Sequence, residues 1–568
     1  MLLCVLCVLC VLCVPSVSVA QQYDILIRNG TVVDGTGSPG RRADVAIRAG
    51  RIVRVDSALG GRAARVIDAS GHVVAPGFID AHSHIDGILE MPDAENLLRQ
   101  GVTTVLGGPD GGSPLPIGRY LARVAALRPG VNLAMLAGHN SVRRAVMGTA
   151  QRAPTPAELQ RMRAMVAQAM RDGAFGLSTG LAYVPGAYSE TDEVVTLARA
   201  AAARGGIYTS HMRDEASGVL RSVRETIEIG RRARIPVVIT HHKVSGRPQW
   251  GMSERTLAMV DSARQEGLDV TVDLYPYTAT QTGIAYLVPA WALADGDSAF
   301  ARRVTSPGLR DSILRGIAHN IRGERGFETL EFVQFARIPW KPELQGHRLS
   351  DWAAERGLPN TPETGAELVA EAVLMGGARV VYHVLDENDV RRIMRHPTAM
   401  IGSDGSINRP GDGHPHPRVY GTFPRVLGHY VREERVLSLE QAVNKMTALS
   451  AARLGLRDRG RIAPGAWADI AVFDPATVSS PATFENPHQY PAGIPWVLVN
   501  GRIAIDDGRL AAGRYGRVLR RRPFRTRASR PPSARRTPGR RRSSSSASRP
   551  GARCGRGRPS RWCSARGW

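Results

Sequence analysis

Short apolar runs alternate with amphipathic stretches along most of the chain. The runs are rich in β-branched residues and are typical of fully buried parallel strands; they include Val73–Ile79 and the segments GIYTS, IPVVIT and TAMI. Apolar residues at helical spacing occupy residues 155–173, 218–234 and 253–267. The first of these stretches opens with TPAE, a capping box with proline in its first turn. The alternation predicts a parallel sheet covered by helices.

About eight such strand–helix units fit between residues 76 and 455, which favours closure into a (β/α)8 TIM-type barrel, an α/β fold. The rhythm breaks between Gly283 and about Gly346. This segment is predicted to be an insertion near the mouth of the barrel. Long insertions in compact domains are usually functional, so we expect it to cover the active site as a lid.

Histidine or aspartate follows the end of several predicted strands. These positions are His82 and His84, His211, His241 and His242, and Asp404. In an extended strand the side chains of residues i and i+2 share a face, so His82 and His84 can bind one metal ion. Active sites of (β/α)8 barrels lie where the strands end. The pattern therefore predicts a metal site there.

Several motifs in order resemble one known family. They are PGFIDAHSHID, QGVTTVLGG, GLSTGLAYVPGAYSET, YTSHMRDEA, ITHHKVSG, DLYPYTA, GSDG and HPHPRVYGTFPRVLGHY. From about Tyr23 to about Gly513 the sequence resembles the D-aminoacylase (N-acyl-D-amino-acid deacylase) family of the amidohydrolase superfamily. The resemblance implies a zinc-dependent barrel and a small β-sandwich built from both chain ends. Strand-like alternation in residues 21–75 and 456–513 agrees with it.

The resemblance also assigns roles to individual residues. It implies metal ligation by His82, His84, His211 and His241, proton transfer by Asp404, and binding of the substrate carboxylate by Lys243, Tyr275 and Arg418. His241 is preferred over His242 because Lys243 matches the family's substrate-binding lysine, and alternation places His241 and Lys243 on one face. His242 is then expected to face outward. A guanidinium also forks onto a carboxylate with two hydrogen bonds, which suits Arg418.

Asp110 marks a departure from the family pattern. Members of the family carry a metal-binding cysteine in GNCG, whereas the aligned stretch here is GGPDG, with Asp110 at that position. The six cysteines are Cys4, Cys7, Cys10, Cys13, Cys554 and Cys563, so none lies near the site motifs. A carboxylate binds zinc and can bridge two ions, and its harder oxygen shifts preference toward manganese or cobalt. Asp110 is predicted to be a metal ligand; a turn residue beside a one-metal site is the alternative.

These residues favour metal-dependent hydrolysis of N-acyl-D-amino acids, with zinc as one or two ions and manganese or cobalt as alternatives. Zinc lowers the pKa of bound water and polarises a carbonyl, and Asp404 moves the proton. A dipeptidase acting on D-amino-acid-containing dipeptides and a cyclic-amide hydrolase are the alternatives within the superfamily. The intact ligand set disfavours a non-catalytic basic protein, and the sequence does not specify the oligomeric state.

The two chain ends differ in composition from the rest. Residues 1–20 resemble a cleavable secretory signal that is too short for a membrane span, which predicts a periplasmic or secreted protein. Residues 514–568 hold 19 arginines and no acidic residue, so a net charge of +24 falls to about +5 without them. This tail is predicted to be disordered. Two interpretations of the tail are open: it binds nucleic acid or an anionic membrane, or it results from out-of-frame translation. The catalytic domain itself is expected to act on a small molecule and not on nucleic acid.

Overall fold

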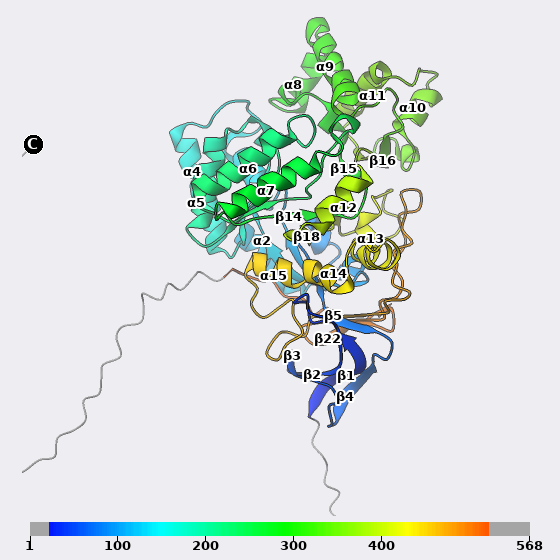
Figure 1. The fold of residues 1–568 in the computed structure, drawn as a ribbon. Helices are drawn as coiled ribbons and strands as arrows, with labels where there is room; N and C mark the ends of the chain where they lie inside the picture. The colour runs from blue at the N-terminus through cyan, green and yellow to red at the C-terminus, as the bar shows by residue number, and fades with distance from the viewer. Residues whose placement is uncertain (1–21, 522–568) are drawn as a thin grey trace, which may run out of the picture. The chain divides into compact units, whose positions relative to one another are not determined.

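Eight parallel strand positions form a ring within residues 22–521, the range that the computed structural model describes (Figure 1). In order they are β6 (Phe78–Asp80), β8 (Val102–Gly107), β9 (Asn132–Met135) continued by β10 (Ala137–Gly138), β11 (Gly176–Gly180), β12 (Ile207–His211), β13 (Val237–Ile239), β14 (Val270–Leu274) and β18 (Ala399–Ile401). The Ala81 N–H donates to the Ile401 carbonyl at 3.4 Å and closes the ring between β18 and β6. The predicted (β/α)8 barrel is confirmed.

Helices cover the outside of the ring. They include α2 (Ile117–Leu127), α3 (His139–Met147), α4 (Pro156–Arg171), α5 (Thr191–Ala202), α6 (Val219–Ala233), α7 (Ser253–Gln265), α12 (Glu387–Arg395), α13 (Arg418–Arg425), α14 (Leu439–Met446) and α15 (Ala448–Leu454). At the start of α4 the Glu158 N–H donates to Thr155 Oγ1 (3.3 Å) and the Thr155 N–H donates to Glu158 Oε2 (2.8 Å). This capping box satisfies two amide groups that the first helical turn leaves without partners.

The apolar run Val73–Ile79 is divided between two sheets. Its first part forms β5 (Val73–Pro76), which pairs with β20 (Ile470–Phe473) from the other end of the chain. Its last part begins β6 of the barrel. The sequence pattern does not show this division, because both parts are buried and equally apolar. The run therefore leads directly from the sheet formed with β20 into the barrel.

Both ends of the described chain build one further sheet, as predicted for the β-sandwich. The first end gives β1 (Tyr23–Val32), β2 (Arg41–Arg48), β3 (Arg51–Asp56), β4 (Ala63–Asp68) and β5; the second gives β20, β21 (Trp496–Val499), β22 (Arg502–Asp506) and β23 (Arg509–Leu510). Side chains of both ends share one apolar cluster, in which Val45 and Leu498 are fully buried. The β5–β20 pairing fixes the two halves to each other.

The insertion is longer than the sequence pattern indicates. A three-stranded antiparallel sheet of β15 (Thr280–Gly283), β17 (Arg379–Tyr382) and β16 (Val333–Arg337) forms its base (Figure 1). Helix α10 (Leu349–Glu355) packs on β16, and α8 (Asp297–Thr305), α9 (Pro307–His319) and α11 (Pro362–Leu374) pack on one another above it. The insertion therefore reaches Tyr382 instead of ending near Gly346. Helix α11 followed by strand β17 has the same sequence pattern as a helix and strand of the barrel. The end of the insertion therefore cannot be recognised from the sequence.

Residues 514–521, predicted as the start of a disordered tail, are packed against the barrel. The Leu133 N–H donates to the Arg517 carbonyl (2.9 Å), the Leu519 N–H donates to the Leu133 carbonyl (2.7 Å), and the Arg521 N–H donates to the Gly173 carbonyl (3.0 Å). The Arg514 guanidinium donates to carbonyls at the end of α2. The disorder prediction is wrong for these eight residues because their arginines bind backbone carbonyls, which composition does not reveal.

Two truncations test this packing. Ending the chain after Arg521 is expected to leave the melting temperature unchanged. Ending it after Gly513 is expected to lower the melting temperature by about 3 to 6 °C, because it removes four backbone hydrogen bonds and the contacts of Leu519. Thermal unfolding of both proteins, followed by circular dichroism, measures the difference. Equal melting temperatures would show that the segment adds nothing to stability.

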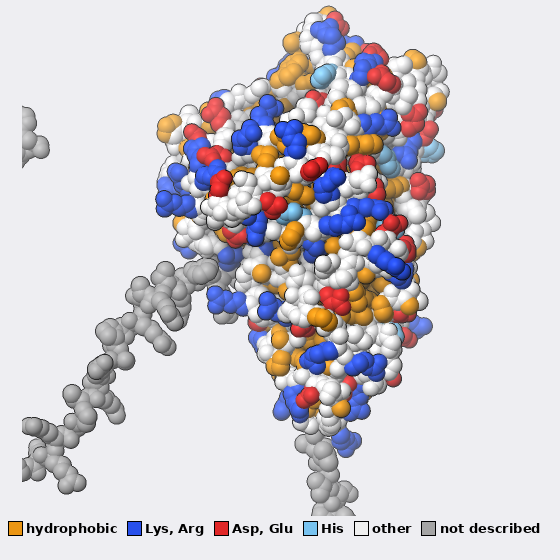
Figure 2. Space-filling view, in the orientation of Figure 1, with side chains coloured by type: hydrophobic (Ala, Val, Ile, Leu, Met, Phe, Trp, Pro, Cys, Tyr) orange, Lys and Arg blue, Asp and Glu red, His pale blue; other side chains and the backbone are white. Residues whose placement is uncertain are grey.

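Acidic and basic side chains are interleaved on the face drawn in Figure 2. This agrees with the assignment of most of the net charge to the arginine-rich end of the chain. In the part of the chain that the structure describes, no helix is long and apolar enough to cross a membrane. The predicted signal peptide (1–20) and the rest of the predicted tail (522–568) lie outside the described residues, so both stay predictions.

Candidate metal centre

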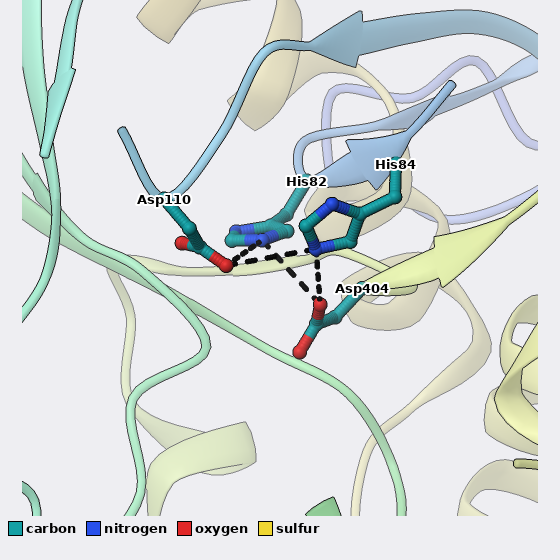
Figure 3. A group of neighbouring side chains, drawn as sticks. All are labelled: His82, His84, Asp110 and Asp404. Atoms are coloured by element: carbon teal, nitrogen blue, oxygen red, sulfur yellow. Dashed lines mark hydrogen bonds and ion pairs between the residues drawn. The ribbon is translucent and has the colours of Figure 1, made fainter. Parts of the chain in front are cut away.

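Six of the predicted side chains meet where the barrel strands end. They are His82 after β6, His84 in β7 (Ser83–His84), Asp110 after β8, His211 at the end of β12, His241 after β13 and Asp404 after β18. Figure 3 shows four of them pointing toward one another: His82 and His84 come from one segment, and Asp110 and Asp404 come from two others. Carboxyl ends of parallel strands share one edge of a barrel, which is why residues up to about 320 positions apart become neighbours.

The first group consists of His82, His84, Asp110 and Asp404 (Figure 3). His84 Nε2 lies 3.0 Å from Asp404 Oδ1 and 3.6 Å from Asp110 Oδ2. His82 Nε2 lies 3.4 Å from Asp110 Oδ2 and 3.6 Å from Asp404 Oδ1. Two imidazole nitrogens and two carboxylate oxygens thus surround one position.

The second group shares Asp110 with the first and adds His211 and His241. His211 Nδ1 and His241 Nε2 are 2.8 Å apart, and His241 Nε2 lies 3.3 Å from Asp110 Oδ1. The two oxygens of Asp110 reach histidines of both groups: Oδ2 is the oxygen nearest His82 and His84 and lies 3.9 Å from His211 Nδ1, and Oδ1 is the oxygen nearest His241. A carboxylate in this position is placed to bridge two ions.

The donor set fits a divalent metal. His82 Nε2 and Asp110 Oδ1 are fully buried, and neither has a hydrogen-bond partner within the described residues. A buried polar atom without a partner costs about 1–3 kcal/mol, which metal ligation would remove. Imidazole nitrogens combined with carboxylate oxygens are donors that zinc, cobalt and manganese accept.

Three of the site residues have a left-handed backbone conformation. The φ angles are +52° at Asp110, +35° at His241 and +51° at Asp404. Such angles are uncommon outside glycine, and residues held in them cluster at functional sites. Each of the three lies two or three residues after the end of a barrel strand, where the chain turns and its side chain reaches the common centre.

Carboxylates that were not predicted from the sequence hold the ligands in place. Asp80 accepts hydrogen bonds from the His82 N–H (3.2 Å) and the Ser403 N–H (2.8 Å). Burial raises the pKa of Asp80 to about 6, although these hydrogen bonds oppose the rise. Asp273 Oδ1 accepts the His241 N–H at 2.6 Å. Both aspartates lie inside motifs that we matched, PGFID and DLYPY, but their inward orientation follows only from the fold.

Glu215 is a further carboxylate that the sequence did not assign. Its Oε1 lies 2.8 Å from Lys243 Nζ and 3.3 Å from His241 Nδ1, and its Oε2 lies 3.7 Å from His211 Nε2. Carboxylates commonly orient metal-binding histidines through the ring nitrogen that does not face the metal. Glu215 therefore couples Lys243 to both histidines of the second group.

His242 points away from the centre, as the alternation predicts. Its Nε2 lies 2.8 Å from Oγ1 of Thr256 on α7, which covers the outside of the barrel. Burial lowers the pKa of His242 to about 3, so the ring is neutral. His241 and Lys243, by contrast, line the central cavity.

Arg418 lies behind Asp404 and does not line the cavity. It is 2% exposed, its Nη1 is 2.9 Å from Asp404 Oδ2, and its guanidinium carbon is 4.7 Å from the centre of the Tyr275 ring. Burial favours the neutral carboxyl, but Arg418 and the hydrogen bond from His84 outweigh it and hold the pKa of Asp404 well below its usual range. Asp404 is therefore ionised at neutral pH.

A cavity of about 350 Å³ opens onto the two groups. Its lining includes five of the six converging side chains, all but His82, together with Glu215, Lys243 and Tyr275; the insertion contributes Thr280, Gln281, Thr282, Gly283, Tyr286 and Arg379. The volume lies within the range of small-molecule sites. The predicted insertion thus forms one wall of this cavity.

Comparison with known proteins places this centre in a family. The model of the amidohydrolase family matches residues 65–505, most of the chain. The chain belongs to the amidohydrolase family. It is 40% identical to an N-acyl-D-glutamate deacylase and 39% identical to a D-aminoacylase, both from Alcaligenes xylosoxydans xylosoxydans. The first match covers 88% of this chain and 97% of the relative, and the second covers 89% and 99%.

Solved structures give the same assignment and narrow it to the D-aminoacylase branch. An N-acyl-D-glutamate deacylase from Bordetella bronchiseptica, complexed with zinc and a phosphonate inhibitor, is 39% identical with a TM-score of 0.76. A D-aminoacylase is 38% identical with a TM-score of 0.75. Each match covers 88% of this chain and all of the other. A D-hydantoinase is only 16% identical (TM-score 0.51), so its likeness concerns the fold alone.

Proposed function

We propose that this protein hydrolyses the amide bond of N-acyl-D-amino acids, releasing a carboxylate and a free D-amino acid. The observation that carries the proposal is the convergence of four histidines and two aspartates at the strand ends. Nearly full-length similarity to three deacylases of N-acyl-D-amino acids, at 37–40% identity, supports the substrate class. A dipeptidase and a cyclic-amide hydrolase are the alternatives that the experiment below distinguishes.

The proposed metal is zinc, with manganese or cobalt as substitutes. His82, His84, His211, His241 and Asp110 would hold one or two ions, with Asp110 shared between the two groups. A bound divalent ion supplies Lewis acidity, which polarises the amide carbonyl and acidifies water. The Bordetella bronchiseptica relative is a zinc complex, and a D-aminoacylase that is 38% identical has a binuclear metal centre.

Asp404 is the proposed proton shuttle. It is ionised, its Oδ1 faces the histidines of the first group, and its Oδ2 is held by Arg418. Asp404 takes a proton from the attacking water and then gives it to the nitrogen of the departing amine. A positioned acid–base group of this kind contributes about 10²–10⁴-fold to rate.

Lys243 and Tyr275 are the proposed contacts of the substrate's α-carboxylate; Arg418, for which the family resemblance implies the same role, is ion-paired with Asp404 and does not line the cavity. Lys243 and Tyr275 line the cavity, and Lys243 Nζ and the Arg418 guanidinium both lie over the Tyr275 ring, at 5.8 Å and 4.7 Å. The hydroxyl of Tyr275 is buried without a hydrogen-bond partner within the described residues. The ammonium group of Lys243 beside the unpaired hydroxyl of Tyr275 suits a carboxylate. A free carboxylate favours an open-chain substrate over a cyclic amide.

A small molecule is the proposed partner of the catalytic domain. A cavity of about 350 Å³ encloses an acylated amino acid but not a nucleic-acid strand. The proposal therefore assigns no nucleic-acid partner to this domain.

Metal removal and a substrate screen test the function together. Purified protein is dialysed against a chelator, checked by elemental analysis, and assayed on N-acetyl derivatives of D- and L-amino acids, D-containing dipeptides and hydantoins. Chelation is expected to abolish hydrolysis of the N-acetyl-D-amino acids, and zinc, cobalt or manganese is expected to restore it. Full activity in metal-free protein would rule out the mechanism. Faster cleavage of dipeptides or hydantoins would favour the alternative activities.

A further inference from the structure

The wall that the insertion contributes to the cavity carries an arginine with no role so far. Arg379, the first residue of β17, lines the same cavity as His84 and Asp404 and is exposed to solvent. Among residues 22–521, no carboxylate lies within 4.0 Å of its guanidinium. The cavity's other cation, Lys243, is already bonded to Glu215 at 2.8 Å. Arg379 is thus a pocket cation that keeps its hydrogen-bonding capacity for a ligand.

The backbone around Arg379 leaves room for such a ligand. Arg379 pairs with Gly283 of β15 on one side and with Arg337 of β16 on the other, so the backbone of Arg379 is fixed between two strands. Gly283 also lines the cavity and places no side chain there. A Cβ built on Gly283 meets no atom closer than the Ala378 carbonyl oxygen at 3.9 Å. The space beside Gly283, the strand neighbour of Arg379, is therefore open.

The chemistry of the remaining wall points the same way. The side chains that the insertion adds are Thr280, Gln281, Thr282 and Tyr286 besides Arg379, and the aliphatic lining is limited to Ile85 and Pro109. A pocket for the side chain of leucine or methionine needs a predominantly apolar wall. Asp86 also lines the cavity and is acidic. A ligand carboxylate is consequently favoured only where it contacts Arg379 directly.

We propose that the cavity selects N-acyl-D-amino acids with an acidic side chain, and that Arg379 binds this second carboxylate. The inference rests on the proposed function and specifies its substrate class. Sequence identity does not decide the matter, because the glutamate deacylase, the aspartate deacylase and the D-aminoacylase are 40%, 37% and 39% identical to this chain. A guanidinium binds a carboxylate through two parallel N–H bonds and gains no such pair from a neutral side chain.

Matched substrates isolate the charge of the side chain. N-acetyl-D-glutamate is compared with N-acetyl-D-glutamine, and N-acetyl-D-aspartate with N-acetyl-D-asparagine, using the full-length zinc-loaded protein. We expect kcat/KM to be about 10-fold or more higher for the acid of at least one pair, the scale of a charge-assisted hydrogen bond. The pair with the larger ratio identifies the preferred chain length.

Variants of Arg379 connect the preference to this residue. Arg379→Gln is expected to remove the preference for the acid while leaving kcat/KM for the amide substrate within about 3-fold, and Arg379→Lys is expected to retain part of it. Arg337→Gln is the matched control, because Arg337 is the strand neighbour of Arg379 but does not line the cavity. It removes one nearby charge and is expected to keep the preference.

Three outcomes would overturn the inference. They are equal kcat/KM values for acid and amide in the unaltered protein, an equal loss on both substrates in Arg379→Gln, and an equal loss of preference in Arg337→Gln. If other N-acetyl-D-amino acids are hydrolysed in these cases, the proposed function survives and only the selectivity is wrong. If no N-acetyl-D-amino acid is hydrolysed, both proposals fail.

Discussion

An Asp404→Asn protein is expected to hydrolyse N-acyl-D-amino acids at least ~10²-fold more slowly while keeping its metal. Asparagine has the same shape as aspartate and retains the oxygen that faces His84, but it cannot take up a proton at neutral pH. Four histidines and Asp110 remain as metal donors. The loss is expected in kcat, because the group acts on the reacting water and amine.

Steady-state kinetics and elemental analysis of the same preparation separate this role from metal binding. Asp412→Asn is a suitable control, because Asp412 is an exposed aspartate in the loop between Asp404 and Arg418 and does not line the cavity. It is expected to match the unaltered protein in both measurements. Activity within a few-fold of normal in Asp404→Asn would exclude Asp404 as the proton shuttle. Loss of zinc in that variant would make it a structural ligand instead.

Local pattern was sufficient to predict the barrel and most of its centre. A buried parallel strand is a short apolar run, so the ends of such runs placed His82, His211, His241, His242 and Asp404 near the ends of the predicted strands. The family resemblance then assigned their roles. The convergence of all but His242 follows from the barrel, because all strand ends share one edge. The match of Lys243 to the family, combined with the alternation of faces, separated His241 from His242.

Features that depend on distant contacts could not be predicted in this way. The insertion was underestimated because α11 and β17 repeat the pattern of a barrel unit although β17 pairs with β15 and β16. Arg517 and its neighbours looked disordered because their partners, such as Leu133, are almost 400 residues away in sequence. The ion pair of Arg418 with Asp404 joins two motif residues whose contact no spacing rule implies.

Asp110 is the residue whose substitution distinguishes most sharply between two metal-site hypotheses. Its oxygens face both groups, and burial is outweighed by His82 and His241, which hold the pKa of Asp110 well below its usual range. A bridging carboxylate supplies negative charge between two cations. The competing hypothesis is that Asp110 only forms a turn, for which its φ of +52° is suitable.

The choice of substitution decides whether the experiment is clear. Alanine at φ +52° would strain the backbone as well as remove the ligand, whereas asparagine and glycine both tolerate the left-handed region. Asp110→Asn and Asp110→Gly therefore preserve the turn and remove the charge. If Asp110 bridges two ions, both variants are expected to bind zinc at least ~10-fold more weakly or to hold fewer ions per chain. Asp110→Cys, which restores an anionic ligand, is expected to recover part of the activity.

The turn hypothesis makes the opposite forecast for the same three proteins. Asparagine and glycine would then keep the full metal content and activity, and cysteine would give no advantage over either. Zinc titration by calorimetry, with metal content per chain from elemental analysis, reads the result without relying on turnover. If Asp110 is a ligand, its one carboxylate can supply negative charge to both groups in a chain without a cysteine near the site motifs, because its oxygens lie 3.3–3.9 Å from nitrogens of all four histidines.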